Sequence, residues 1–168
     1  MGDRPKIKLE LTAFDKALEI MGGVLIFAIW ILLGVSYSNL PESIPMHYNA
    51  AGEADAFGSK SSILGLPLVA TALFIGLSIL NQYPHTFNYP DKITEENARY
   101  QYRNSTRMLR CLKLVILIIF GMATYLTIRN AHQETAQIGK WFLPLTLGLI
   151  FIPVICFLIR AYRGDSKN

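Results

Sequence analysis

Four apolar stretches, each long enough for one helix to cross a lipid bilayer, dominate this chain of 168 residues. They cover approximately residues 18–37, 62–80, 109–128 and 141–159. The chain is 52% hydrophobic and only 17% charged, whereas about a quarter of the residues in a soluble domain are charged. The pattern excludes an ordinary soluble enzyme, a disordered chain and a disulfide scaffold. It predicts an all-α integral membrane protein with four transmembrane helices.

A single four-span domain over residues 1–168 fits this length. Within it we distinguish a module at 18–80, a loop with a helix extension at 81–108 and a second helical hairpin at 109–160. Thr12, followed three residues later by Asp15, predicts the start of the first helix. The first apolar stretch is longer than the core of a cleaved signal peptide, about 7–15 residues, so we expect it to remain as a membrane anchor.

The Lys and Arg residues that flank the spans predict the orientation of the chain. Twelve lie in the N-terminal arm, the middle loop and the C-terminal tail: Arg4, Lys6, Lys8, Lys16, Lys92, Arg99, Arg103, Arg107, Arg110, Arg160, Arg163 and Lys167. Three lie in the other two loops: Lys60, Arg129 and Lys140. Cytoplasmic loops carry the excess of basic residues. We therefore expect both termini in the cytoplasm and the loops at 39–61 and 130–140 outside. This placement also explains the net charge of +4 without a nucleic-acid partner.

Small residues in the spans predict close contacts between helices. They are Gly22, Gly23, Ala72, Gly76, Gly121 and Gly148. Pro144 and Pro153 predict bends in the fourth span.

Glu19 lies just inside the first span, and we expect it to pair with Lys16, Arg110 or Lys113 at the cytoplasmic edge. No acidic residue falls deep in any span, which argues against active transport. Cys111 and Cys156 lack the spacing of metal ligands and are expected to be apolar packing residues. The sequence therefore predicts no metal and no cofactor.

A stripe of basic residues precedes the third span. A helix should begin after Thr94, with Glu95 and Glu96 in its first turn, and continue into that span. The stripe residues share one helix face and are Arg99, Arg103, Arg107 and Arg110. At the cytoplasmic surface such a face is expected to contact anionic lipid headgroups. A docking face for an acidic protein is the alternative.

The loop between the first and second spans is unusually long and rich in turn residues. Its candidate site residues, either for a ligand or partner or for the structure of the loop, are His47, Asn49, Gly52, Glu53, Asp55 and Lys60. Asn49 and Gly52 suit a tight turn. Asn49 and Asp55 are expected to cap turns, and Lys60 to pair with Glu53 or Asp55. The sequence thus predicts an ordered extracytoplasmic loop whose polar side chains converge.

Three chemical alternatives for this loop remain open. Asn49, Glu53 and Asp55 could ligate calcium, although their spacing differs from an EF-hand. His47 with the carboxylates could bind zinc, although no second His or Cys lies nearby. A serine hydrolase would need an activated nucleophile, and no serine of the loop shows a recognisable spacing to His47 and a carboxylate.

Ten residues of this loop carry a resemblance to a known family. They are Leu40, Pro41, Ile44, Pro45, His47, Asn49, Gly52, Asp55, Gly58 and Lys60. In this pattern the chain resembles the bacterial membrane family named domain of unknown function 1648. The resemblance covers the first two spans and their loop. It implies a protein of the bacterial cytoplasmic membrane and supplies no catalytic residue. Some relatives carry this module before a second membrane domain, and one of them gives immunity against a sporulation-delaying peptide toxin.

Two classes of function follow from these observations, with a third ranked behind them. The first is a non-enzymatic immunity, sensor or accessory factor whose outside loop recognises a peptide or a membrane-protein partner. The second is a small transporter or channel. The third is a membrane enzyme or cation-binding protein that uses the polar residues of the loop. Association of several copies into a homo-oligomer is compatible with each class.

Overall fold

The structure is a computed structural model that describes residues 4–90, 92–133 and 136–165, without the side chains of residues 163–165. Lys167 of the C-terminal basic group and the side chain of Arg163 thus lie outside the described part. The elements in chain order are α1 (Ala13–Ser36), η1 (Tyr37–Asn39), β1 (Ser43–Tyr48), β2 (Ala54–Ser59), η2 (Lys60–Leu64), α2 (Gly65–Leu80), η3 (Pro84–Thr86), α3 (Glu95–Asn130) and α4 (Phe142–Asp165). Four helical segments are long and apolar enough to cross a membrane, which confirms the predicted spans.

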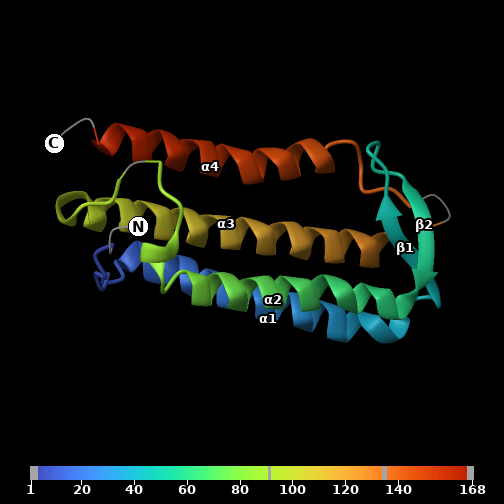
Figure 1. Cartoon of the computed structure of the whole chain (residues 1–168). Helices are drawn as coiled ribbons and strands as arrows, with labels where there is room; N and C mark the ends of the chain where they lie inside the picture. The colour runs from blue at the N-terminus through green and yellow to red at the C-terminus, as the bar shows by residue number, and fades with distance from the viewer. Residues whose placement is uncertain (1–3, 91, 134–135, 166–168) are drawn as a thin grey trace.

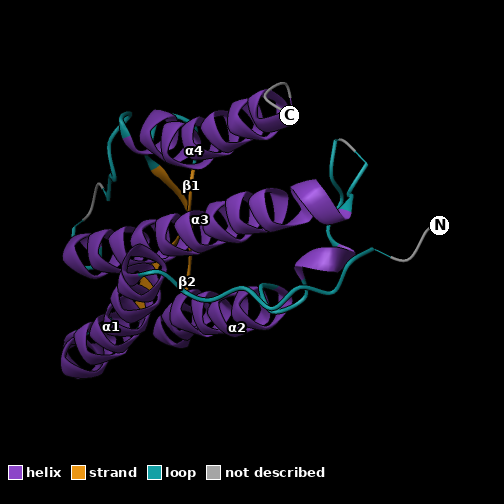
Figure 2. Ribbon diagram, turned by 90° about the vertical axis from the view of Figure 1, so that its left-hand side faces the viewer, coloured by secondary structure: helices purple, strands orange, loops and turns teal. Residues whose placement is uncertain are grey.

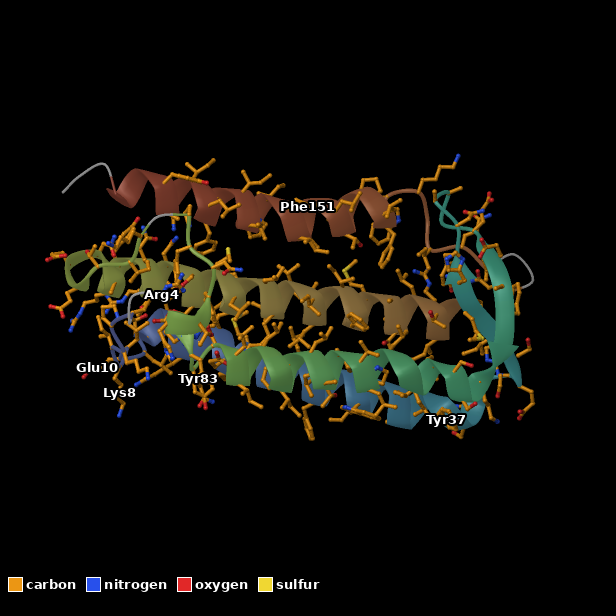
Figure 3. The ribbon with its side chains drawn as sticks, viewed as in Figure 1. Arg4, Lys8, Glu10, Tyr37, Tyr83 and Phe151 are labelled. Atoms are coloured by element: carbon orange, nitrogen blue, oxygen red, sulfur yellow. The ribbon has the colours of Figure 1, made fainter. Side chains whose placement is uncertain are left out.

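The four helices form one bundle with α3 at its centre, in contact with α1, α2 and α4 (Figures 1 and 2). The β-hairpin closes one end of the bundle, and the chain's described beginning and the end of α4 lie at the other (Figure 1). We call these the hairpin end and the terminal end. Polar side chains gather at both ends, while Phe151 points outward from the middle of α4 (Figure 3).

Both predicted helix starts are confirmed. The Thr12 hydroxyl accepts from the Asp15 N–H, and the Asp15 carboxylate accepts from the Thr12 N–H, which completes a capping box. Thr94 and Asn97 form the same arrangement at the start of α3. The helix then continues for 36 residues without a break, so the basic stripe and the third span form one rigid rod.

The hairpin corrects the prediction of an all-α fold. Strands β1 and β2 pair antiparallel, with irregularities in register around His47. Ile44 and Pro45 of β1 are buried against the bundle, while Met46 and His47 are exposed. Pro45 is tolerated because a two-stranded sheet consists only of edge strands. The strands are short, and two prolines lie in or next to β1, so the sequence pattern offered no clear alternation from which to predict them.

The apolar core is divided between the two ends of the bundle. At the hairpin end, Ile44 packs against Leu33, Leu40 and Ile63. At the terminal end, Ile7 and Leu9 of the N-terminal arm pack against a cluster of Ile93, Ala98 and Tyr102. The N-terminal arm therefore covers protein surface.

Two of the glycines predicted at helix contacts do permit a close approach. A Cβ on Gly22 would lie 2.8 Å from the Phe74 ring, and one on Gly121 would lie 3.4 Å from Ile29. A Cβ on Gly23 or Gly76 would meet nothing within 4 Å. Ala72 and Gly76 of α2 are both exposed, so the helix contact predicted for them is wrong.

Candidate functional site

Asn49 organises the turn of the hairpin, as the sequence predicted. Its Oδ1 accepts from the N–H groups of Ala51 and Glu53, at 2.9 and 3.1 Å, and its Nδ2 donates to the Glu53 carboxylate. Gly52 follows with a φ of +77°, in the left-handed region that only glycine adopts without strain. Local hydrogen bonds thus fix the turn before any other element contacts it.

The turn is clasped by the loop that connects α3 and α4. The Ala54 N–H donates to the Ala136 carbonyl at 2.9 Å, and the Ile138 N–H donates to the Gly52 carbonyl at 2.8 Å. A Cβ on Gly52 would lie 2.6 Å from the Gly139 oxygen, so only glycine fits where the hairpin turn meets the loop between α3 and α4. We call the hairpin together with residues 136–139 the hairpin cap.

The charged side chains of the hairpin form separate pairs, whereas the sequence predicted that they converge. His47 Nδ1 lies 2.6 Å from Asp55 Oδ1, with the two side chains 69% and 44% exposed. Lys60 pairs with Glu42 at 2.7 Å, so its predicted pairing with Glu53 or Asp55 is wrong. Within the described residues Asp55 pairs with the His47 ring and accepts from no backbone N–H, so its predicted capping role is also wrong.

The strands of the hairpin also carry exposed apolar side chains. Met46 and Phe57 are 55% and 53% exposed. Beneath Met46 a cavity of about 340 Å³ lies between the hairpin, α2 and α3, lined mainly by Ile44, Ile63, Leu66, Val69 and Phe120. Burial raises the pKa of the Tyr48 phenol, which faces inward from the same strand. The cap therefore offers an apolar surface on a fixed frame.

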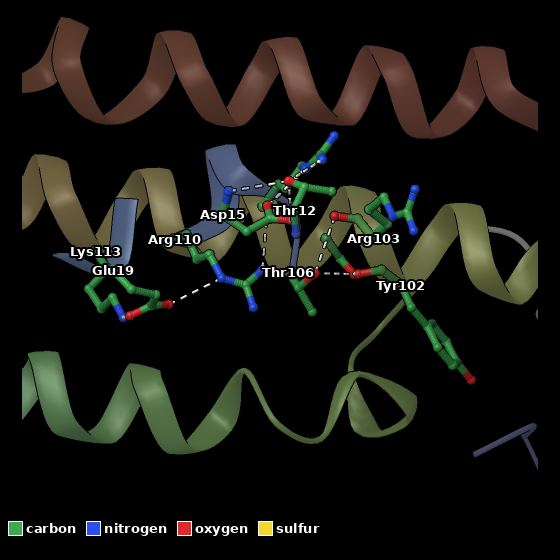
Figure 4. Close-up of polar contacts among 10 residues, drawn as sticks. Thr12, Asp15, Glu19, Tyr102, Arg103, Thr106, Arg110 and Lys113 are labelled. Atoms are coloured by element: carbon green, nitrogen blue, oxygen red, sulfur yellow. Dashed lines mark hydrogen bonds and ion pairs between the residues drawn. The ribbon is translucent and has the colours of Figure 1, made fainter. Parts of the chain in front are cut away.

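A second group of polar residues lies between α1 and α3, towards the terminal end (Figure 4). Arg107 Nε donates to Asp15 at 2.9 Å, and Arg110 Nε donates to Glu19 at 3.1 Å. Lys113 donates to Glu19 as well, and to Ser78 of α2 at 2.7 Å. We call Asp15, Glu19, Arg107, Arg110 and Lys113 the interhelix ion cluster.

The ion cluster changes the interpretation of the basic stripe. Arg110 and Lys113 are 8% and 2% exposed, so they face the bundle interior. Arg107 also points to α1, and of the four stripe residues Arg99 is exposed. The expectation that all four arginines face lipid is therefore wrong for Arg107 and Arg110.

The sequence predicted one half of this cluster and missed the other. Glu19 pairs with two of its three candidate partners, Arg110 and Lys113. The pair of Asp15 and Arg107 was missed because Asp15 already had a local role in the capping box. An acidic residue in the first turn of one helix and an arginine in the matching turn of another would have been the only signal.

No arrangement typical of a catalytic or metal centre accompanies these groups. Among the described residues there is no group of three or more His, Cys, Asp or Glu side chains that could hold a metal ion. Cys111 and Cys156 are free thiols.

Comparison with known proteins supports a family assignment. The family model described as domain of unknown function, DUF1648, matches residues 24–71. An uncharacterised protein from Archaeoglobus fulgidus is 31% identical over 165 residues, which cover 90% of this chain and 84% of that protein. The chain belongs to the DUF1648 family. No solved structure matches the DUF1648 chain.

The DUF1648 match can be placed on the structure. It begins inside α1, includes the whole hairpin and ends inside α2. The candidate site residues of the hairpin therefore lie within the matched residues 24–71, whereas the interhelix ion cluster lies outside them. The similar protein comes from Archaeoglobus fulgidus, so the bacterial origin that the sequence resemblance implied stays a prediction.

Proposed function

We propose that this protein is a non-enzymatic membrane protein whose hairpin cap recognises a peptide or another membrane protein outside the cytoplasm. The observation that carries the proposal is the pair of exposed apolar side chains, Met46 and Phe57, on a hairpin that the backbone hydrogen bonds of Gly52 and Ala54 hold in place. Exposed apolar groups on a rigid element are typical of recognition surfaces. An immunity, sensor or accessory role would each use such a surface.

The location of the hairpin within the segment matched by the family model supports this proposal. The match covers the second half of α1, the whole hairpin and the beginning of α2, and it ends before the ion cluster residues of α3. The hairpin, without residues 136–139 of the cap, therefore lies in the segment that the family model describes. The side chains on its surface would then determine the partner.

A photo-crosslinking amino acid placed at Phe57 in cells tests the proposal. The expected result is a discrete protein or peptide adduct that disappears when Met46 is replaced by Asp. The control position is Tyr162, which is 61% exposed near the end of α4 at the far end of the bundle. Lipid adducts alone at Phe57, equal to those at Tyr162, would rule out a recognition surface.

The recognition surface requires a particular orientation in the membrane. We infer that both termini lie in the cytoplasm of a bacterium or archaeon, because twelve of the fifteen flanking basic residues lie on that side. Reporter fusions at residue 168 and inside the turn at Asn49–Asp55 should report opposite compartments. Signals from the same compartment would contradict the four-span arrangement, and opposite signals of the reverse kind would reverse its orientation.

A small transporter or channel is the second candidate. Its support is the ion pair between Glu19 and Lys113, because ionisable side chains between membrane helices often mark ion pathways. Reconstituted vesicles that contain the wild-type protein should then pass an ion or proton current that Lys113→Met abolishes. Equal leakage with wild-type and variant protein would leave the pair with a structural role only.

A further inference from the structure

The edge of β2 that faces away from β1 already carries a short strand partner. The Glu53 carbonyl accepts from the Asn49 N–H on the β1 side, so the residues on either side of Glu53 direct their backbone groups the other way. There Gly52 and Ala54 bond to the loop before α4 and enclose an antiparallel bridge between Glu53 and Gln137. We call this side of β2 the outer edge. The molecule itself shows that the outer edge accepts an extended backbone.

The outer edge continues beyond this partner. The pairing with the loop stops at Ala54, whereas β2 extends to Ser59. Within the described part of the chain, no hydrogen bond joins the N–H groups of residues 55–59 to a segment other than β1. An antiparallel pair leaves alternate backbone groups of each strand unpaired on its outer edge. Strand β2 contains no buried residue and lies beyond β1 on the side away from the helices (Figure 1). The outer edge is therefore accessible to another chain.

One backbone donor of the outer edge can be identified. The Lys60 N–H donates to the Glu42 carbonyl at 3.0 Å, so Lys60 directs its N–H towards the start of the hairpin. Its neighbour Ser59 then directs its N–H to the outer edge. The φ of Ser59 is −57°, close to the value that a proline ring imposes. Its N–H can thus be removed with the backbone conformation retained.

The hairpin that presents this edge is acidic. It and its flanking residues contain the carboxylates Glu42, Glu53 and Asp55 against a single lysine, Lys60. Lys60 pairs with Glu42, and the His47 ring pairs with Asp55. Glu53 is exposed and forms no salt bridge within the described residues. A basic side chain next to Glu53 would complement this charge.

We propose that the outer edge of β2 binds an extended segment of a partner polypeptide as an additional strand, beside the loop that already pairs with Gly52 and Ala54. This inference rests on the proposed function of the hairpin cap as a recognition surface. Main-chain hydrogen bonds to residues 55–59 supply the affinity, as in other cases of strand addition. The exposed side chains of Phe57 and Glu53 supply selectivity for a segment with apolar and basic residues.

A pair of variants at Ser59 tests strand addition in cells. The photo-crosslinking amino acid is placed at Phe57, within the edge. Ser59→Pro removes the N–H of the outer edge, whereas Ser59→Ala removes the same hydroxyl and keeps the N–H, so it is the matched control. The adduct of Ser59→Pro should form about tenfold less than that of Ser59→Ala, the effect of one lost hydrogen bond and an unpaired carbonyl on the partner.

A second measurement uses the wild-type protein and does not require the proline variant to fold. Mass spectrometry identifies the crosslinked segment of the partner, and synthetic peptides that copy this segment are made with one N-methyl group at each residue in turn. Binding to the purified full-length protein is measured in detergent. Because alternate N–H groups of an added strand face β2, affinity should fall about tenfold at every second residue.

The outcomes separate this inference from the proposed function. An adduct that Met46→Asp removes and Ser59→Pro retains would overturn strand addition and leave the recognition surface in place. Peptides that do not bind, or that lose affinity without alternation, would also overturn strand addition. An adduct with a second copy of this chain would replace the partner polypeptide by a homodimer. Absence of any adduct at Phe57 would overturn both proposals.

Discussion

The ammonium group of Lys113 on α3 donates to the carboxylate of Glu19 on α1, and Lys113 is only 2% exposed. The same ammonium donates to Ser78 of α2 and lies 4.6 Å from the ring centroid of Phe74. One side chain of the central helix therefore connects two of its three neighbouring helices, α1 and α2. Glu19 in turn accepts from Arg110, so it balances two buried cations.

Replacement of Glu19 should be strongly destabilising. Glu19→Ala leaves Lys113 and Arg110 without their shared partner, and loss of one member of a buried ion pair costs about 3 kcal/mol. Combining it with Lys113→Met should recover much of this loss. Unfolding in detergent by denaturant measures the free energy. Glu10→Ala removes an exposed carboxylate of the N-terminal arm and serves as the control. A double variant as unstable as the sum of the single variants would contradict the pairing.

Two arginines of the basic stripe should behave differently. Arg107→Gln should lower the free energy of unfolding by about 2 kcal/mol, because Asp15 is 2% exposed and loses its cationic partner. Arg99→Gln should leave stability unchanged and weaken anionic lipid binding, by about 1 kcal/mol. Unfolding and native mass spectrometry measure the two properties. If both variants bind anionic lipid more weakly and neither changes the free energy of unfolding, Arg107 does not pair with Asp15 in the membrane.

The turn of the hairpin should depend on Asn49 more than on Asp55. Asn49→Ala removes the acceptor of two backbone N–H groups and should cost about 1–2 kcal/mol. Asp55→Ala breaks an exposed pair with His47 and should cost at most about 1 kcal/mol. Thermal unfolding with calcium and with a chelator compares them. A calcium-dependent stabilisation that Asp55→Ala removes would restore the cation site considered from the sequence.

Stability should decline at alkaline pH through Tyr89. Burial raises the pKa of this phenol to about 12, while its hydroxyl lies within hydrogen-bond distance of the Pro84 carbonyl and of Ser105. In the unfolded chain this phenol has the ordinary pKa of 10. Between these two values only the unfolded state loses the proton, so the free energy of unfolding falls as pH rises. The contribution is complete below about pH 10.

Comparison of tyrosinate absorbance in the wild-type protein and Tyr89→Phe isolates this titration. The difference curve should have its midpoint near pH 12, as the pKa of the folded protein requires. A midpoint at the ordinary value would show that Tyr89 is solvated. The arm residue Arg4, whose guanidinium lies 5.7 Å from the Tyr89 ring centroid, would then also be detached.

The sequence predicted the helices well because their signals are local. Apolar length defines a membrane span, and the capping residues Thr12 and Thr94 define where two helices begin. The turn at Asn49 and Gly52 was equally clear from residue type. In each case a few neighbouring residues determine the geometry.

The remainder depends on contacts between distant segments, which the sequence does not display. Residues 136 and 138 bind Gly52 and Ala54 through backbone atoms alone, so no side-chain pattern predicts this contact. Lys60 pairs with Glu42, and not with the two carboxylates that are closer in sequence, because antiparallel pairing brings the start and the end of the hairpin together. The burial of Arg107 and Arg110 follows from the carboxylates on α1.

The end of helix α4 is hydrogen-bonded to the bundle through its own main chain. Three side chains of α3 donate to its carbonyl groups: Tyr100 to Arg160, Gln101 to Ala161 and Asn104 to Phe157. Carbonyl groups are present whatever residues a helix contains. These three hydrogen bonds therefore set the position of the end of α4 without requiring any particular side chain at residues 157, 160 and 161.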